Sequence, residues 1–266
     1  MGLIKRIYED YFKQDRLPLY KSLLEVARKH NYIMMGIQDF YNLLSAEGFK
    51  VNNDTRFLIN RHDIDTSPKI ARRMFEIEKG VYGHEGSSTY YFRFTTIDKK
   101  LIKEIEDYGY ETGFHYEVLA DYEKRHKLKD TQKLMLHMPE IRKLFLKDLQ
   151  KYRAITGTAS RTVASHGDFI NTMINMQSYE ILRDSDTRDK SNIILEAYDN
   201  SINQYIVERF ADQLLLERFS SEVIRSIEQD CKIIMILTHP RNWTVDIVAN
   251  TQENMRRLYQ GLKYKI

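Results

Sequence analysis

The first fifty residues repeat apolar side chains with the period of amphipathic helices. One such face runs through Leu19–Ala27 and a second through Phe40–Leu44, with apolar residues three and four positions apart as a helix requires. Between them, Tyr32–Met35 is a short apolar run. We therefore predict two helices with room for a short strand between them.

From Arg56 onwards the pattern changes to short apolar runs that alternate with helical segments. Near-continuous apolar runs such as 232–237 are typical of strands that are covered on both faces. Pro68 and Gly80 mark the start and the end of one helix, since proline suits a first turn and glycine a C-terminus. Strands are predicted at 57–60, 88–94, 111–115, 162–165, 205–209 and 232–237, and helices at 69–79, 98–107, 130–152, 220–229 and 246–262.

Strands that alternate with helices predict the α/β fold class with parallel strands. Right-handed crossovers then bring the C-terminal end of every strand to the same side of the sheet. The 266 residues include four prolines and 11 glycines, and these do not cluster into a linker. A single α/β domain of this length is common, so we predict one domain over residues 1–266.

Composition and charge narrow the class of protein. The chain has 41 basic and 38 acidic residues, interleaved along most of its length, for a net charge of +3. This pattern argues against nucleic acid as a partner. Cys231 is the only cysteine, which excludes an intramolecular disulfide. No apolar run is long enough for a transmembrane segment, and the N-terminus lacks the apolar core of a secretory signal, so we expect a cytoplasmic protein.

Potential metal ligands and acid–base groups fall where the predicted strands end. Asp63 and Asp65 follow one strand, and His115, His166 and His239 end or follow three others. In an α/β barrel these strand ends meet at one mouth, where active sites lie. Neutral imidazole and carboxylate groups bind zinc and similar divalent ions. The sequence therefore predicts a divalent-metal centre with acid–base groups beside it.

Each of these residues also has a purely structural interpretation. Asp63 and Asp65 suit the N-cap and first turn of the following helix. His115 suits a buried, hydrogen-bonded imidazole, His166 a turn beside a glycine, and His239 the plain end of a strand. The common placement at strand ends favours the metal centre over these separate explanations.

At these residues the chain resembles the polysaccharide deacetylase (NodB-type) superfamily of carbohydrate esterases. It is most similar to a divergent branch with an RHDVD-type first motif that is associated with surface-polysaccharide and O-antigen biosynthesis. The resemblance covers roughly residues 55–245. The matching segments, in the order of the family, are FLINRHDIDTSPKIARRMFEIEKGV, SSTYYFRF, YGYETGFHYE, ASHGDF and IIMILTHPRNW.

The resemblance implies a fold and a ligand set. The fold is a distorted, incomplete (β/α)7 TIM-like barrel over residues 55–266, with residues 1–54 as a helical segment packed on it. In the first motif of the family one Asp is the general base and the other ligates the metal, which assigns Asp63 as base and Asp65 as ligand, although Ile64 separates them and the two roles could be exchanged. His115 matches the first histidine of the second motif.

The chain departs from the family at three motifs. Leu119 stands where the second motif has its second histidine, so the third ligand is His166, with Glu117 as the reserve. The late Leu-His motif of the family matches loosely and suggests His239 as the acid that protonates the leaving group. The family's Arg-Pro segment is replaced by Ser-His-Gly, and Arg61 becomes the candidate to orient the base or to contact substrate.

Two aromatic residues near the strand ends are candidates for sugar binding, because aromatic faces stack on sugar rings. They are Tyr116 and the single tryptophan, Trp243. For Trp243, a sugar platform and core packing are equally good interpretations.

The implied function is metal-dependent hydrolysis of an acetyl group, by amide or ester cleavage, from a sugar during cell-surface polysaccharide biosynthesis. Such an enzyme acts on carbon–nitrogen bonds other than peptide bonds when the acetyl group is an amide. Zinc is the expected metal, with nickel, cobalt or iron as options, and the partner is a carbohydrate intermediate. Two alternatives remain: a relative that binds a glycan or partner without turnover, and a metal-independent hydrolase or epimerase.

Overall fold

A computed structural model describes residues 3–48, 55–213 and 216–265 of the chain. Contacts divide the chain into two compact units, Met1–Thr112 with Asn200–Gln252 and Gly113–Asp199 with Glu253–Ile266. Strand β4 (Glu111–Tyr116) and helix α13 (Ile247–Lys265) each begin in the first unit and continue in the second. The prediction of one domain, with a boundary at residues 54 and 55 that lies partly outside the described residues, stays a prediction.

The first unit is built on parallel strands around β2. The first half of β2 pairs with β1 and its second half with β3, while β8 pairs along its other edge and is followed by β7. The pairing with β1 confirms a short strand in the N-terminal segment and places it in the sheet. The strands are β1 (Tyr32–Met35), β2 (Arg56–Ile64), β3 (Thr89–Phe92), β7 (Glu208–Ala211) and β8 (Ile233–Thr238).

Strand β2 is longer than the sequence suggests. It continues through Ile64, so Asp63 lies inside the strand and not after it. The extension follows from the neighbours of β2, because β3 pairs with Arg61–Ile64 and β8 with Phe57–His62. Polar side chains are tolerated in a buried strand when they are hydrogen-bonded, as those of β2 are.

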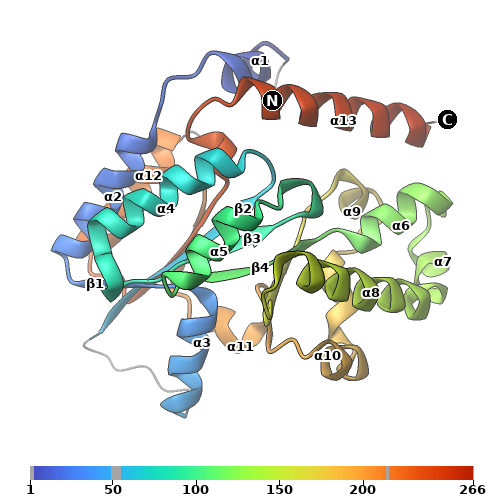
Figure 1. The fold of residues 1–266 in the computed structure, drawn as a ribbon, viewed down its shortest axis with the longest axis horizontal. Helices are drawn as coiled ribbons and strands as arrows, with labels where there is room; N and C mark the ends of the chain where they lie inside the picture. The colour runs from blue at the N-terminus through green and yellow to red at the C-terminus, as the bar shows by residue number, and fades with distance from the viewer. Residues whose placement is uncertain (1–2, 49–54, 214–215, 266) are drawn as a thin grey trace. The chain divides into compact units, whose positions relative to one another are not determined.

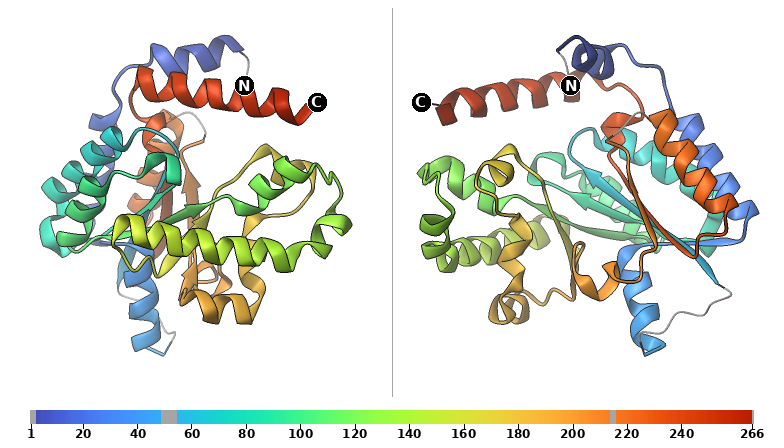
Figure 2. Two further views of the ribbon diagram at one scale, coloured as in Figure 1. Left: turned by 45° about the vertical axis from the view of Figure 1, so that its right-hand side comes forward. Right: turned by 180° about the vertical axis from the view of Figure 1, so that it is seen from behind.

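Helices cover this sheet in the first unit. Helices α2, α4 and α12 lie side by side (Figures 1 and 2), with α2 in contact with both of the others. Helix α5 begins as predicted, because the Asp98 carboxylate accepts the backbone N–H groups of Lys100 and Leu101 and so satisfies two donors of the first turn. The helical elements are α1 (Leu3–Tyr11), α2 (Leu17–Lys29), α3 (Ile37–Ala46), α4 (Pro68–Tyr82), η1 (Gly83–Glu85), η2 (Phe94–Thr96), α5 (Lys99–Asp107), α11 (Asn200–Asn203), α12 (Leu216–Glu228), η4 (Pro240–Asn242) and α13 (Ile247–Lys265).

In the second unit, β5 pairs in parallel with β4 and with β6. The helix predicted over 130–152 is in fact two helices that meet at His137. Proline at 139 explains the break, since it lacks the N–H that would continue the first helix and suits the first turn of the second. Helix α6 is an element that the sequence analysis missed. The elements are β4 (Glu111–Tyr116), α6 (Val118–His126), α7 (Thr131–Leu136), α8 (Met138–Thr156), β5 (Thr162–Ser165), α9 (Phe169–Met173), η3 (Ser178–Arg183), α10 (Ser185–Ser191) and β6 (Leu195–Glu196).

The α/β class with parallel strands is therefore confirmed. The predicted strand at 205–209 is found two to three residues later, as β7. Among the described residues, every helix is too short or too polar to cross a lipid bilayer.

Candidate active site

Arg61 and Asp63 form a buried ion pair at the C-terminal half of β2. Residues two apart on a strand point to the same face, so the pair is set by the strand itself. The Arg61 Nε and a terminal guanidinium nitrogen each donate to a different carboxylate oxygen at 2.8 Å, and the two residues are 1% and 3% exposed. The guanidinium also lies over the ring of Tyr91, 5.4 Å from its centroid. Two-point pairing fixes the orientation of the Asp63 carboxylate, which supports the interpretation that Arg61 orients this group.

His239 follows β8 and is held by Asp212, which follows β7. Its Nδ1 lies 2.7 Å from one carboxylate oxygen of Asp212, and its backbone N–H donates to the other oxygen at 2.7 Å. Since a carboxylate accepts hydrogen bonds, Nδ1 carries a proton. The other ring nitrogen, Nε2, is left for contact with a substrate. This is the arrangement that orients a catalytic imidazole.

The surroundings of His239 favour its protonated form. Burial acts to lower the pKa of His239, but the negative charge and hydrogen bond of Asp212, together with the charges of Asp65 and Asp63, raise this pKa from 6.5 to about 9. His239 is therefore an imidazolium at neutral pH and can donate a proton.

Asp65 lies on the loop just after β2, which places it beside the Asp63 end of the strand. Its backbone N–H donates to the carbonyl of Asp63 at 3.1 Å, and Arg93 donates to the Asp65 carbonyl at 3.5 Å. Thr96 anchors the same loop through the Ile64 carbonyl at 2.7 Å. Helix α4 begins at Pro68 with no side-chain cap, so neither Asp63 nor Asp65 serves as its N-cap.

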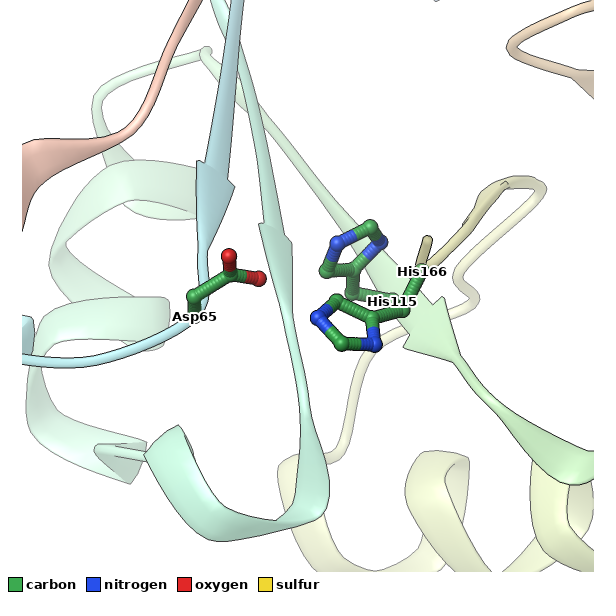
Figure 3. A group of neighbouring side chains, drawn as sticks. All are labelled: Asp65, His115 and His166. Atoms are coloured by element: carbon green, nitrogen blue, oxygen red, sulfur yellow. The ribbon is translucent and has the colours of Figure 1, made fainter. Parts of the chain in front are cut away.

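In the second unit, the structure brings His115 and His166 together from two strands (Figure 3). His115 comes from β4 and His166 follows β5, and their rings meet edge to face with centroids 5.2 Å apart. The Nδ1 of His115 lies 3.0 Å from the Ala164 carbonyl, which can only accept, so Nε2 is left as the ligand atom. The His166 backbone N–H donates to the Tyr116 carbonyl at 2.8 Å. A nitrogen of each ring lies within 4.8 Å of one on the other, as two ligands of one ion require.

Carboxylates stand beside this pair. Glu117, the reserve ligand, lies 3.2 Å from Nδ1 of His166, and Glu117, His166 and Asp168 form a group whose ligand atoms lie within 4.8 Å of one another. Asp168 has two structural tasks, since it caps α9 through Ile170 and pairs with Lys124. Of these two carboxylates, Glu117 is therefore better suited to bind an ion.

The two predicted sugar-binding aromatics are both fully buried. The Trp243 Nε1–H donates to Asp212 at 2.9 Å, and its ring packs edge-on against Tyr20 and Phe219. These contacts favour the packing interpretation for Trp243. The ring of Tyr116 packs against Phe145, and contact of either ring with substrate stays a prediction.

The structure adds polar residues that the sequence analysis did not single out. Asp212 orients His239, and Arg93 supports the Asp65 loop. On the other face of β2, His62 is held by Thr238 at 2.5 Å and by Glu78 at 2.7 Å. The sequence offered one sign of Asp212, which is that it lies three residues beyond the predicted strand at 205–209.

Comparison with known proteins finds no family model, no curated protein and no solved structure that matches this chain. The resemblance to the polysaccharide deacetylases therefore depends on the motifs alone.

Proposed function

We propose that this protein is a metal-dependent hydrolase that removes an acetyl group from a sugar. The observation that supports the proposal is the pair His115 and His166 of the second unit, whose ring nitrogens lie within 4.8 Å of one another. The motif resemblance adds Asp65 as the third ligand. Two imidazoles and one carboxylate form a ligand set of catalytic zinc, with a coordination position left for water or substrate.

The chemistry of the donors fits a divalent ion. The Nδ1–H of His115 donates a hydrogen bond to the Ala164 carbonyl, which is how proteins hold the ring of a metal-bound histidine and leave Nε2 for the ion. A bound ion would polarise the acetyl carbonyl and make water more acidic. Zinc suits the donors best, and nickel, cobalt and iron accept the same set.

The chain supplies a base and an acid for the proton transfers. Asp63, which is paired with Arg61, takes a proton from water. The oxygen of that water attacks the acetyl carbon. His239, protonated at neutral pH, gives its Nε2 proton to the leaving nitrogen as the carbon–nitrogen bond breaks. Water and an N-acetyl sugar thus give acetate and an amino sugar.

The substrate class and setting belong to the same proposal. An amino sugar carried as an intermediate of cell-surface polysaccharide assembly is the substrate that the motif resemblance supports, and a cytoplasmic site of action suits such an intermediate. The parallel strands of the two units are compatible with the incomplete (β/α)7 barrel of the deacetylases.

Metal content and turnover test the proposal together. Purified protein is expected to hold about one equivalent of zinc, nickel, cobalt or iron by elemental analysis, and to release acetate from N-acetylated amino sugars. The His115→Ala and His166→Ala variants are expected to lose both the metal and the activity, because each removes a ligand. A His126→Ala variant, which changes a histidine of α6 outside this site, is the matched control and keeps both.

Three results would contradict the proposal. Full metal content in the His115→Ala, His166→Ala double variant would refute the ligand assignment. Undiminished turnover in chelator would show that the hydrolase needs no ion. Bound metal without acetate release from any acetylated sugar would favour the glycan-binding alternative.

A further inference from the structure

With the exception of Tyr264, which is 5% exposed, helix α13 buries polar side chains and exposes its large apolar side chains. The inward positions include Asn250 and Glu253, which are 1% and 6% exposed. Asn250 donates to the Asp10 carbonyl at 2.8 Å, and Glu253 pairs with Arg256 and Arg257 at 2.8 and 2.6 Å. This is the reverse of the usual amphipathic helix, whose apolar face covers the core.

The outward residues form one continuous stripe, which we call the α13 stripe. At 100° per residue its members fall within an arc of about 120°, so they share one side of the helix. Each of these side chains is between 56% and 67% exposed. Isolated exposed apolar residues are ordinary on protein surfaces, but a patch of them marks a binding surface. The stripe consists of Ile247, Val248, Met255, Leu258, Tyr259 and Leu262.

The charges on the helix indicate which kind of surface would fit the α13 stripe. Between residues 247 and 265 the only acidic residue is Glu253, and it is buried. The exposed charges are basic, with Arg257 and Lys263 among them. An apolar stripe with basic and no exposed acidic residues is the pattern of helices that lie in the interface of an anionic membrane.

A basic cavity lies at the N-terminal end of the stripe, within the first unit. Its volume is about 550 Å³, and Ile247, Val248 and the 69%-exposed Phe12 are among its lining residues. Lys69 and Arg73 of α4 also line it, together with the acidic Asp246, whose carboxylate is engaged by Ser67 at 2.6 Å and by the Ala249 N–H at 3.0 Å. Arg73 pairs with Asp15 at 2.5 Å. The lining thus combines lysine and arginine with apolar side chains, which suits a phosphate headgroup at the edge of an acyl layer.

We propose that the α13 stripe docks this protein on an anionic phospholipid surface, with the helix parallel to the membrane plane. A second copy of the chain is less suited to the stripe, because a pair of α13 helices would bring Arg257 and Lys263 of both copies together. The only carboxylate of the helix is the buried Glu253, which already pairs with Arg257. The inference concerns binding and is independent of the proposed hydrolase activity.

Sedimentation with lipid vesicles tests the docking. The full chain is expected to bind vesicles of phosphatidylcholine with phosphatidylglycerol, to bind pure phosphatidylcholine much more weakly, and to be released by salt, which screens the charges. A Met255→Glu, Leu258→Glu variant should lose about 100-fold or more of the partition coefficient, because two buried apolar side chains become charged.

The matched control carries the same charge change elsewhere. Met135→Glu with Leu136→Glu alters two exposed apolar residues of α7, 51% and 81% exposed, and is expected to bind like the wild type. Circular dichroism checks that each variant is folded, and Val248→Ser with Leu262→Ser is a milder stripe variant that should also weaken binding.

Three results would overturn the docking proposal. The first is failure of the wild type to sediment with anionic vesicles. The second is equal binding by the wild type and a folded stripe variant. The third is a stripe-dependent dimer in light scattering with no vesicle binding, which would make a second copy the occupant of the stripe.

Discussion

Strand β2 carries buried polar side chains on both of its faces, and the two faces differ in what those side chains contact. On one face, Asn60 and His62 both bond to Glu78 of α4, at 3.0 and 2.7 Å. Tyr20 and Tyr90 donate to the same carboxylate at 2.5 and 2.7 Å. This face is a hydrogen-bonded network that ties β2 to α2, α4 and β3, and it stabilises the fold.

On the other face, Arg61 holds Asp63 at the end of the strand where the Asp65 loop begins. The negative charges of Asp63 and Asp65 help to raise the pKa of His239, which follows the neighbouring strand β8. The candidate acid–base groups Asp63 and Asp65 therefore lie at this end of the strand. Burial of polar groups alone does not mark an active site, and their place at the C-terminal end of parallel strands is the distinguishing feature.

The largest expected difference between the faces is in turnover. Asp63→Asn should reduce acetate release about 10²- to 10⁴-fold, because it removes the proposed base and keeps its shape. Metal content should remain that of the wild type. Turnover close to the wild-type value in this variant would remove Asp63 from the mechanism.

A substitution on the face of β2 that contacts Glu78 should affect stability more than turnover. Burial acts to raise the pKa of Glu78, but His62 and the hydrogen bonds from His62, Tyr20 and Tyr90 outweigh it and lower this pKa. Glu78→Gln should reduce the free energy of unfolding on the order of 3 kcal/mol in urea titrations at pH 7.

The pH dependence of that loss provides its control. A lowered carboxyl pKa stabilises the folded state above the unfolded value of 4.5, and this contribution is lost as the pH falls through the folded pKa. The stability difference between the wild type and Glu78→Gln should therefore shrink in acid. A difference that stays constant with pH would mean that the charge of Glu78 is not what stabilises the network.

A smaller change should appear in the titration of His239. Asp212→Asn removes the main charge that raises the pKa of His239, so this pKa should fall from about 9 toward 6.5. The stability that the raised pKa contributes is fully present below pH 6.5 and is lost as the pH rises through about 9. Histidine NMR titration of metal-free protein measures the pKa, and the alkaline limb of the rate profile should move down with it. An unchanged pKa would show that Asp212 is not its main cause.

The smallest effect is expected at Trp243, and it separates packing from sugar binding. Trp243→Phe should reduce the free energy of unfolding by about 1–2 kcal/mol, because the ring is buried and Asp212 loses a donor. The KM for an acetylated sugar should stay the same. A severalfold rise in KM at unchanged stability would instead support the sugar platform.

The sequence by itself determined the fold class and placed most candidate residues at strand ends. Asp63, which lies inside β2, is the exception. Apolar periodicity reports local backbone geometry, and it located most of the strands and helices because that information lies within a few residues. It also placed His115 and His166 at the ends of strands that the structure pairs as neighbours.

Only the tertiary structure decided which partner each of these residues has. Glu78 lies 16 residues from His62, and Asp212 lies 27 residues from His239. No local pattern links such pairs, because the packing of α4 and the register of β7 against β8 bring them together. The same reason explains the α13 stripe. The sequence shows that apolar residues share one side of the helix, but the contacts of Asn250 with Asp10 and of Tyr264 with Glu123 decide that this side faces outward.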